Sequence, residues 1–282
     1  MLVAKVGSVT IGDGHPVLIA GPCVAESLDL CRLVAEEMQR ICSLLSIQYI
    51  FKASFDKANR SGAGSERGLG LDAGLELLNK ISVEFRVPVT TDVHLPDQAK
   101  PVAQVVHLLQ VPAFLCRQTD LLDACAETGR AVNVKKGQFL SPLDTGNIVE
   151  KLKLANAAGI VLTERGTSFG YNNLVVDMAG LPVMRSLGVP VCFDATHSAQ
   201  RPGAGGNKSG GNREAIPHLA AAAAAVGIDA LFMEVHPDPE HAVSDAATQW
   251  PLAKAEELVR HTMRIWKVAS EAANVARASS GM

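Results

Sequence analysis

Residues 131–164, AVNVKKGQFLSPLDTGNIVEKLKLANAAGIVLTE, contain one complete strand–helix–strand unit. The runs 131–135 and 159–164 are short and rich in Val, Ile and Leu, which is typical of buried strands. Between them, residues 147–158 place apolar side chains near the three-to-four spacing of an amphipathic helix. This order predicts two parallel strands joined by a crossover helix.

The same rhythm extends in both directions along the chain. Further strands are predicted at residues 17–21, 49–53, 87–92, 105–110, 189–194 and 230–235, and further helices include 28–45 and 74–85. Eight such units predict a closed (β/α)8 TIM barrel, because a doubly wound open sheet usually has fewer strands. The chain is therefore interpreted as an α/β protein with one barrel domain over residues 1–282.

The two ends of the chain add small elements to this barrel. Residues 5–14 (KVGSVTIGDG) alternate around glycines, which predicts a short N-terminal β-hairpin that plugs the barrel bottom. Residues 249–276 are predicted to form the last long helix.

Composition excludes several classes of function. A formal charge of -3 and 4% aromatic residues argue against a nucleic-acid-binding surface. Residues 1–10 lack the pattern of a signal peptide, and no stretch is long and apolar enough to span a bilayer. Six cysteines without a close CxxC pair indicate reduced thiols. We expect a soluble, cytoplasmic protein.

The predicted strand ends carry many charged side chains. In a β/α barrel the active site lies at the C-terminal ends of the strands. Five cations fall there: Lys52, Lys57, Arg60, Lys135 and Arg165. Any one of them is equally compatible with an ordinary surface ion pair. Together they predict one or two phosphorylated ligands, because crowded cations repel one another unless anions satisfy them.

A second group of strand-end residues has the chemistry of metal ligands. Cys23, His197 and Glu234 follow strands one, seven and eight, which are neighbours in a closed barrel, and Asp245 lies in the loop after strand eight. A mixed thiolate, imidazole and carboxylate set suits zinc, iron(II) or manganese better than calcium or magnesium. The alternative is that Cys23 is a small buried apolar residue.

The stretch 198–213 (SAQRPGAGGNKSGGNR) is rich in glycine and lacks bulky apolar residues. Because it follows strand seven beside the predicted site, we expect a lid that closes over substrate and excludes water. The alternative is a surface loop without function.

At these residues the sequence resembles the 3-deoxy-D-manno-octulosonate 8-phosphate synthase family along nearly its whole length. The motifs are IAGPCVAES (19–27), FKASFDKANRSG (51–62), TTDVH (90–94), FLCRQTDLL (114–122), NVKKGQFLSP (133–142), LTERGTSFGYNNLVVDM (162–178), DATHS (194–198) and MEVHPDPEHAVSDAATQ (233–249). The family has a metal-dependent branch with Cys and a metal-free branch with Asn at one position, and Cys23 resembles the former.

The resemblance implies roles for individual residues. The implied metal ligands are Cys23, His197, Glu234 and Asp245, the set reached above from the strand ends. The resemblance implies that phosphoenolpyruvate is bound by Lys52, Gln110, Lys135, Arg165 and His197, and arabinose 5-phosphate by Lys57, Asn59, Arg60, Ser61 and Asp92, with Arg117 of a neighbouring subunit on its phosphate. The residues expected to act in catalysis are Lys52, Lys57, Asp92, Lys135 and His197.

The implied reaction joins C3 of phosphoenolpyruvate to the aldehyde carbon of the pentose phosphate, with water adding at C2 and phosphate leaving by C–O cleavage. The resemblance also implies a homotetramer and a role in lipopolysaccharide synthesis. A related family, 3-deoxy-D-arabino-heptulosonate 7-phosphate synthase, uses erythrose 4-phosphate and carries Lys-Pro-Arg-Thr/Ser where this chain has KANRS. The other alternative is a phosphosugar-binding barrel without turnover.

Overall fold

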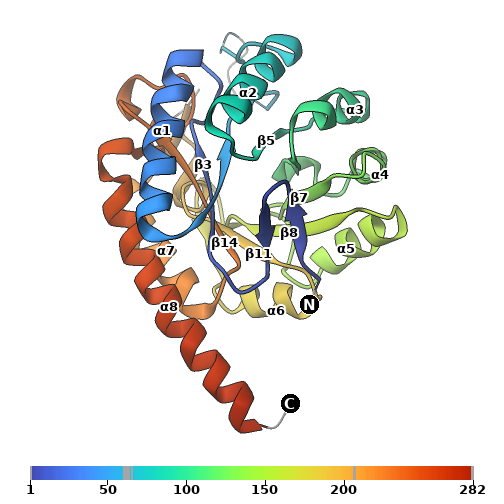
Figure 1. Cartoon of the computed structure of the whole chain (residues 1–282), viewed down its shortest axis with the longest axis vertical. Coiled ribbons are helices and arrows are strands. Elements are labelled where there is room, and N and C mark those ends of the chain that lie inside the picture. The colour runs from blue at the N-terminus through green and yellow to red at the C-terminus, as the bar shows by residue number, and fades with distance from the viewer. Residues whose placement is uncertain (1, 60–63, 65, 206–207, 281–282) are drawn as a thin grey trace.

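The chain folds into a closed barrel of parallel strands surrounded by helices (Figure 1). The structure is a computed structural model, and it describes residues 2–59, 64, 66–205 and 208–280. Strands pair in the order β3-β4-β5-β6-β7-β8-β11-β14, and β14 pairs with both β3 and β11. That last pairing closes the ring, so the predicted (β/α)8 architecture is confirmed.

The barrel strands are buried on both faces, which explains their nearly continuous apolar sequences. Their bounds are β3 Val17–Gly21, β4 Gln48–Lys52, β5 Val89–Asp92, β6 Leu108–Val111, β7 Ala131–Lys135, β8 Gly159–Glu164, β11 Val191–Asp194 and β14 Ala230–His236. Each strand ends close to its predicted residue, so the polar side chains at the strand ends point to one face of the barrel.

The outer helices pack one apolar face against the barrel. Their bounds are α1 Leu28–Leu45, α2 Leu71–Phe85, α3 Pro96–Val105, α4 Thr119–Ala126, α5 Thr145–Leu154, α6 Gly180–Ser186, α7 Ile216–Val226 and α8 Ala255–Ser280. In α1 the buried residues Val34, Met38 and Ile41 recur at helical spacing. Its first turn is fixed by Ser27, whose hydroxyl accepts a 3.2 Å hydrogen bond from the Leu30 amide.

A hairpin closes the barrel at the end opposite the loops that follow the strands. It consists of β1 (Ala4–Val6) and β2 (Val9–Ile11), so the predicted N-terminal hairpin is confirmed. Val6 and Ile11 are fully buried, in one apolar cluster with Ile19, Phe232 and other residues of the barrel strands. The hairpin therefore supplies apolar side chains that fill the barrel bottom.

Two predicted boundaries were wrong for local reasons. The strand expected at 105–110 begins only at Leu108, because α3 continues to Val105 and the Val106 amide caps it by donating a hydrogen bond to the Val102 carbonyl. The last helix begins at Ala255, because Trp250–Pro251 form the short strand β15 beside β14 and a 3-10 turn follows. Short apolar runs do not distinguish strands from helix ends.

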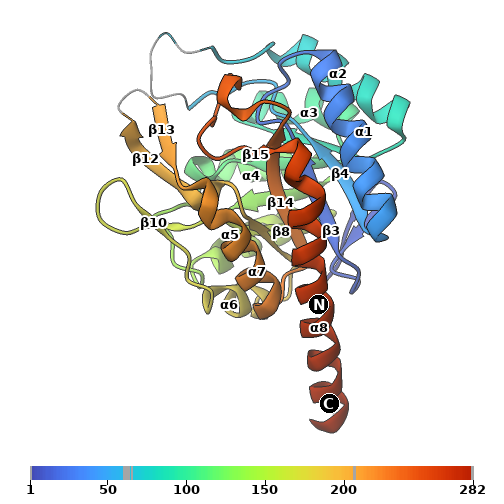
Figure 2. The same cartoon turned by 90° about the vertical axis from the view of Figure 1, so that its left-hand side faces the viewer.

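The glycine-rich stretch after β11 is not an irregular loop. Strands β12 (Gln200–Gly205) and β13 (Lys208–Gly211) form an antiparallel pair, and residues 206 and 207 lie outside the described residues. Figure 2 shows this pair beside β10 (Leu174–Val175), on the side of the molecule away from α1. No helix in the described ranges is both long and apolar enough to cross a membrane.

Candidate active site and metal centre

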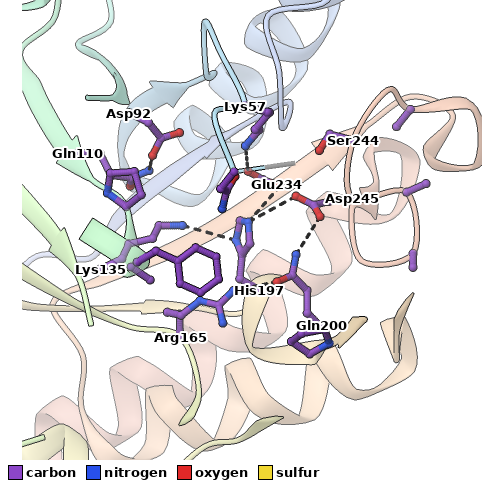
Figure 3. Close-up of a pocket in the computed structure, with 18 of the residues that line it drawn as sticks. Lys57, Asp92, Gln110, Lys135, Arg165, His197, Gln200, Glu234, Ser244 and Asp245 are labelled. Carbon is purple, nitrogen blue, oxygen red and sulfur yellow. Dashed lines mark hydrogen bonds and ion pairs between the residues drawn. The ribbon is translucent and has the colours of Figure 1, made fainter. Parts of the chain in front are cut away.

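A cavity of about 510 Å³ opens at the C-terminal ends of the barrel strands. Strand ends and the segments that follow them contribute polar side chains to it: Lys52, Lys57, Asn59, Asp92, Gln110, Lys135, Arg165, His197, Glu234 and Asp245. Figure 3 shows the side chains that it labels pointing toward one another. The structure therefore brings together most of the site residues expected from the sequence.

Three of the four predicted metal ligands form a compact cluster. Ligand atoms of Cys23, Glu234 and Asp245 all lie within 4.8 Å of one another. The Cys23 thiol, which is fully buried, donates a 3.2 Å hydrogen bond to Asp245 Oδ2. His197 Nε2 lies 3.6 Å from Glu234 Oε2 and 3.8 Å from Asp245 Oδ2. The fourth predicted ligand thus lies against two members of the cluster.

The His197 ring is oriented by the carboxylate of Asp194. Nδ1 lies 2.7 Å from Asp194 Oδ2, and the Asp194 carboxylate also accepts the His197 backbone amide over 2.9 Å. Because a carboxylate can only accept hydrogen bonds, Nδ1 is the donor in this contact, and Nε2 faces Glu234 and Asp245. A carboxylate behind the imidazole is the usual support for a metal-binding histidine.

The charges in the cluster fit a divalent cation. Burial and the nearby Glu234 carboxylate raise the pKa of the Cys23 thiol well above its ordinary value. Lys52 neutralises one Glu234 oxygen at 2.6 Å, which leaves Oε2 directed at His197. A thiol, an imidazole and two carboxylate oxygens therefore converge, and this donor set suits zinc, iron(II) or manganese.

Asp245 has a strained backbone conformation, and a side-chain hydrogen bond holds its carboxylate in place. Its φ of 51° lies in the left-handed region, which non-glycine residues adopt rarely. Its Oδ1 accepts a 2.9 Å hydrogen bond from Gln200 Nε2. Strained backbone at a functional residue persists only where the surroundings fix it, and here Gln200 does so.

A cationic pair occupies the other side of the cavity. Lys135 Nζ lies 2.5 Å from Asp194 and 3.7 Å from the centre of the Phe232 ring. Arg165 donates from Nη2 to Gln200 over 2.8 Å, whereas its buried Nη1 has no partner among the described residues. Burial lowers the pKa of the Arg165 guanidinium. An unsatisfied guanidinium nitrogen beside a lysine is a site for an anionic oxygen.

Asp92 faces the cavity from β5. It accepts hydrogen bonds from Ser54 and, over 2.6 Å, from Gln110. Burial raises its pKa, but Lys52 and Lys57 lower it by more, so its pKa lies well below the ordinary value. Asp92 is therefore an ionised hydrogen-bond acceptor in the cavity.

The remaining predicted residues have different outcomes. Lys57 lines the cavity with its Nζ 3.7 Å from Glu234 Oε1; burial lowers its pKa, but Cys23 and Glu234 raise it by more. Asn59 also lines the cavity. Arg60 and Ser61 lie outside the described residues. Arg117 is exposed on the segment after β6, apart from the residues that line the cavity.

Sequence reasoning did not assign three residues that support the site. Asp194 was visible at a strand end three positions before His197, but its contact with the ring was not inferred. Gln200 was placed in the predicted lid, although it binds both Arg165 and Asp245. Gln249 accepts the Cys23 amide across 226 positions of sequence, and no local pattern indicates such a contact.

A closed β/α barrel with an anion-binding, metal-compatible cavity at its strand ends defines a class of enzymes that act on phosphorylated substrates. The chain belongs to the DAHP synthetase I family, whose profile matches residues 1–271. It is similar to the 2-dehydro-3-deoxyphosphooctonate aldolase of Synechococcus sp., with 54% identity over 96% of each chain.

Other relatives carry the same name. The protein from Cyanothece sp. is 57% identical over 91% of this chain and 94% of its own length. The protein from Dechloromonas aromatica is 56% identical over 86% of this chain and 88% of its own. The similarity thus spans the barrel and the residues of its cavity.

Proposed function

We propose that this enzyme condenses phosphoenolpyruvate with D-arabinose 5-phosphate and water, giving 3-deoxy-D-manno-octulosonate 8-phosphate and inorganic phosphate. The observation that carries the proposal is the pairing of two subsites in one cavity. The buried cluster of Cys23, Glu234 and Asp245 lies on one side, and the unpaired Arg165 nitrogen beside Lys135 lies on the other. Relatives that share half or more of the sequence support the same reaction.

The side chains divide the work between the two substrates. Lys135 and Arg165 bind the phosphate of phosphoenolpyruvate, with Lys52 and Gln110 beside its carboxylate. Lys57, Asn59 and Asp92 hold the pentose phosphate, with Arg60 and Ser61 on the same segment and Arg117 contributed by a neighbouring subunit of a homotetramer. The cations stabilise the negative charge that develops as the carbon–carbon bond forms and phosphate leaves.

Cys23, His197, Glu234 and Asp245 would hold a divalent metal, which supplies Lewis-acid chemistry when bound. Asp194 accepts a hydrogen bond from His197 Nδ1 and so orients Nε2 toward Glu234 and Asp245. The proposal places the enzyme in the cytoplasm, in the synthesis of lipopolysaccharide.

The test is phosphate release from phosphoenolpyruvate with either arabinose 5-phosphate or erythrose 4-phosphate, before and after chelation and metal replacement. We expect release with the pentose that is lost on chelation and restored by metal. Preference for erythrose 4-phosphate would instead assign the heptulosonate reaction. Pentose activity that is indifferent to the chelator would contradict the metal site alone. No release with either sugar and metal present would indicate a non-catalytic barrel.

A further inference from the structure

A chain of hydrogen bonds crosses the barrel interior from β8 to β5. The Thr163 hydroxyl donates to Asn133 Oδ1 over 2.6 Å, and Asn133 Nδ2 donates to Gln110 Oε1 over 3.1 Å. Gln110 Nε2 then donates to Asp92 Oδ1 over 2.6 Å. We call Thr163, Asn133, Gln110 and Asp92 the polar relay. It links four neighbouring strands side chain to side chain.

The relay side chains point into the barrel. Val161, Ala131 and Leu108 precede the first three relay residues by two positions, and all three belong to the inner apolar cluster of the barrel bottom. Side chains two apart in a strand share a face, so the relay forms the next inward layer toward the cavity. Asp92 and Gln110 line the cavity, whereas Asn133 and Thr163 are not among its lining residues and are fully buried.

The relay has one direction, and Asp92 fixes it. A carboxylate only accepts hydrogen bonds, so Gln110 must present its NH2 group to Asp92. Its oxygen must then face Asn133, which presents its own NH2 group and turns its oxygen toward the Thr163 hydroxyl. Reversing any amide would place two acceptors or two donors in contact inside the barrel, where an unsatisfied polar group is costly.

The charges around Asp92 maintain this direction. Lys52 and Lys57 face it from β4 and the segment after β4, His94 from the segment after β5, and Lys135 from β7. The lysines keep Asp92 ionised, so the acceptor at the end of the relay persists. The orientation of the Gln110 amide at the cavity wall thus depends on the charge of Asp92 at one end of the relay and on the buried Asn133 and Thr163 at the other.

We propose that Asn133 and Thr163 are positioning residues, which hold the Gln110 amide in the orientation that binds phosphoenolpyruvate and the Asp92 carboxylate in the orientation that binds the sugar phosphate. This inference rests on the proposed function. Burying a polar side chain costs free energy unless it is hydrogen-bonded, and the layer below Asn133 and Thr163 is apolar. The hydrogen bonds that Asn133 and Thr163 make lead to Gln110 and Asp92. Their role is to act through Gln110 and Asp92.

The test compares Thr163→Val with Thr163→Ser and Thr90→Val. Thr90 is a matched control, because it is equally buried on β5 but donates its hydroxyl to the Leu108 carbonyl, outside the relay. We expect Thr163→Val to raise KM for arabinose 5-phosphate about tenfold, the size of one lost hydrogen bond. The KM for phosphoenolpyruvate should rise as well, because Gln110 lies beside the carboxylate of that substrate. Thr163→Ser should restore the wild-type value, and Thr90→Val should keep it.

A double-mutant cycle separates positioning from general destabilisation. In Asp92→Asn the introduced amide donates as well as accepts, so the relay loses its fixed direction and Thr163→Val should have little further effect. Equal KM values in Thr163→Val and Thr90→Val, or an undiminished effect in the Asp92→Asn background, would overturn the inference. If Thr163→Val does not fold, Asn133→Leu removes the hydrogen-bond donor to Gln110 directly.

A second readout does not require turnover. The side-chain NH2 signals of Gln110 in an amide NMR spectrum, identified by their loss in Gln110→Glu, should shift in Thr163→Val and stay unchanged in Thr90→Val. If the wild-type enzyme forms no product, the proposed function fails, and these signals alone decide whether the relay positions Gln110. Unchanged signals in Thr163→Val would reject the relay while leaving the proposed function intact.

Discussion

The Asp194 carboxylate serves two different side chains at once. It contacts His197 Nδ1 at 2.7 Å and Lys135 Nζ at 2.5 Å. His197 faces Glu234 and Asp245, and Lys135 lies on the side of the cavity where we propose that phosphate binds. One buried carboxylate therefore orients a side chain on each side of the cavity. Burial raises its pKa, but His197 and Lys135 lower it more, and the net shift is well below the ordinary value.

Replacing Asp194 should therefore weaken metal binding. In Asp194→Asn the anionic acceptor for His197 Nδ1 is lost, and we expect metal affinity to fall about 10- to 100-fold. Competition between the protein and a chromogenic chelator for zinc measures this change. Asp229→Asn is the matched control, because Asp229 is also buried but binds Arg185 and the Val191 amide before β14 begins. Equal zinc affinities in the two variants would contradict the assignment.

Asp92 should make the fold sensitive to acid. Its folded-state pKa lies below the ordinary 3.8, because Lys52 and Lys57 outweigh burial. The stability that it contributes is thus present above pH 3.8 and is lost as the pH falls toward the lowered value. Urea unfolding from about pH 5 down to about pH 2 should show a smaller loss in Asp92→Asn than in the wild type.

Asp229 provides a control of opposite sign, because burial raises its pKa. Its contribution is present at low pH and declines as the pH rises, so Asp229→Asn should make the acid loss steeper. If both variants changed the pH dependence in the same direction, the two assignments would be wrong.

The site residues that could be predicted are those whose strand ends meet. Cys23, His197 and Glu234 come from adjacent strands, so barrel closure alone places them together. Asp194, Gln200 and Gln249 could not be assigned in this way, because their roles depend on side-chain directions and on loop paths. Sequence spacing predicts at which strand end a residue lies, but it does not predict with which atom its side chain forms a hydrogen bond.

At the scale of elements, Gly21 at the end of β3 leaves no room for a side chain beside β4. A Cβ atom there would lie 1.9 Å from the Lys52 carbonyl oxygen. Gly21→Ala should therefore push the two strands apart, and we expect a loss of about 1–3 kcal/mol in the free energy of unfolding. Urea denaturation measures it. Gly146→Ala in α5 is the control, since its nearest contact would be the flexible Leu187 side chain at 3.4 Å, and it should be neutral or stabilising.

Elements with a long, regular pattern could be predicted well. The predicted bounds of α1 and β8 match the structure. The 18 residues of α1 keep an uninterrupted helical period, and the 6 residues of β8 form an uninterrupted, mostly apolar run. The pairing of β12 with β13 could not be foreseen, because their glycine-rich sequence shows neither the alternation of a strand nor the three-to-four spacing of a helix. That pair flanks the cavity through Gln200 and Gly203, so the expected position beside the site is correct although its expected form is not.

At the scale of the whole molecule, stability and chemistry lie at opposite ends of the barrel. The β1–β2 hairpin packs against one end, and the cavity opens at the other. Ile11→Ala should open a cavity in the buried bottom layer and lower the free energy of unfolding by about 2–5 kcal/mol. Steady-state assays at a temperature where the variant stays folded should give unchanged KM values. A changed KM with undiminished stability would contradict this separation.

The closure of the barrel also has a consequence for biosynthesis. Cys23 belongs to the first barrel strand end, whereas its partner Asp245 lies 222 residues later. A ribosome adding roughly 5–20 residues per second needs on the order of tens of seconds to deliver the second residue after the first. The nascent chain must therefore keep the Cys23 thiol without its partners throughout that interval, and the metal that we propose for this cluster would be loaded late in the maturation of the enzyme.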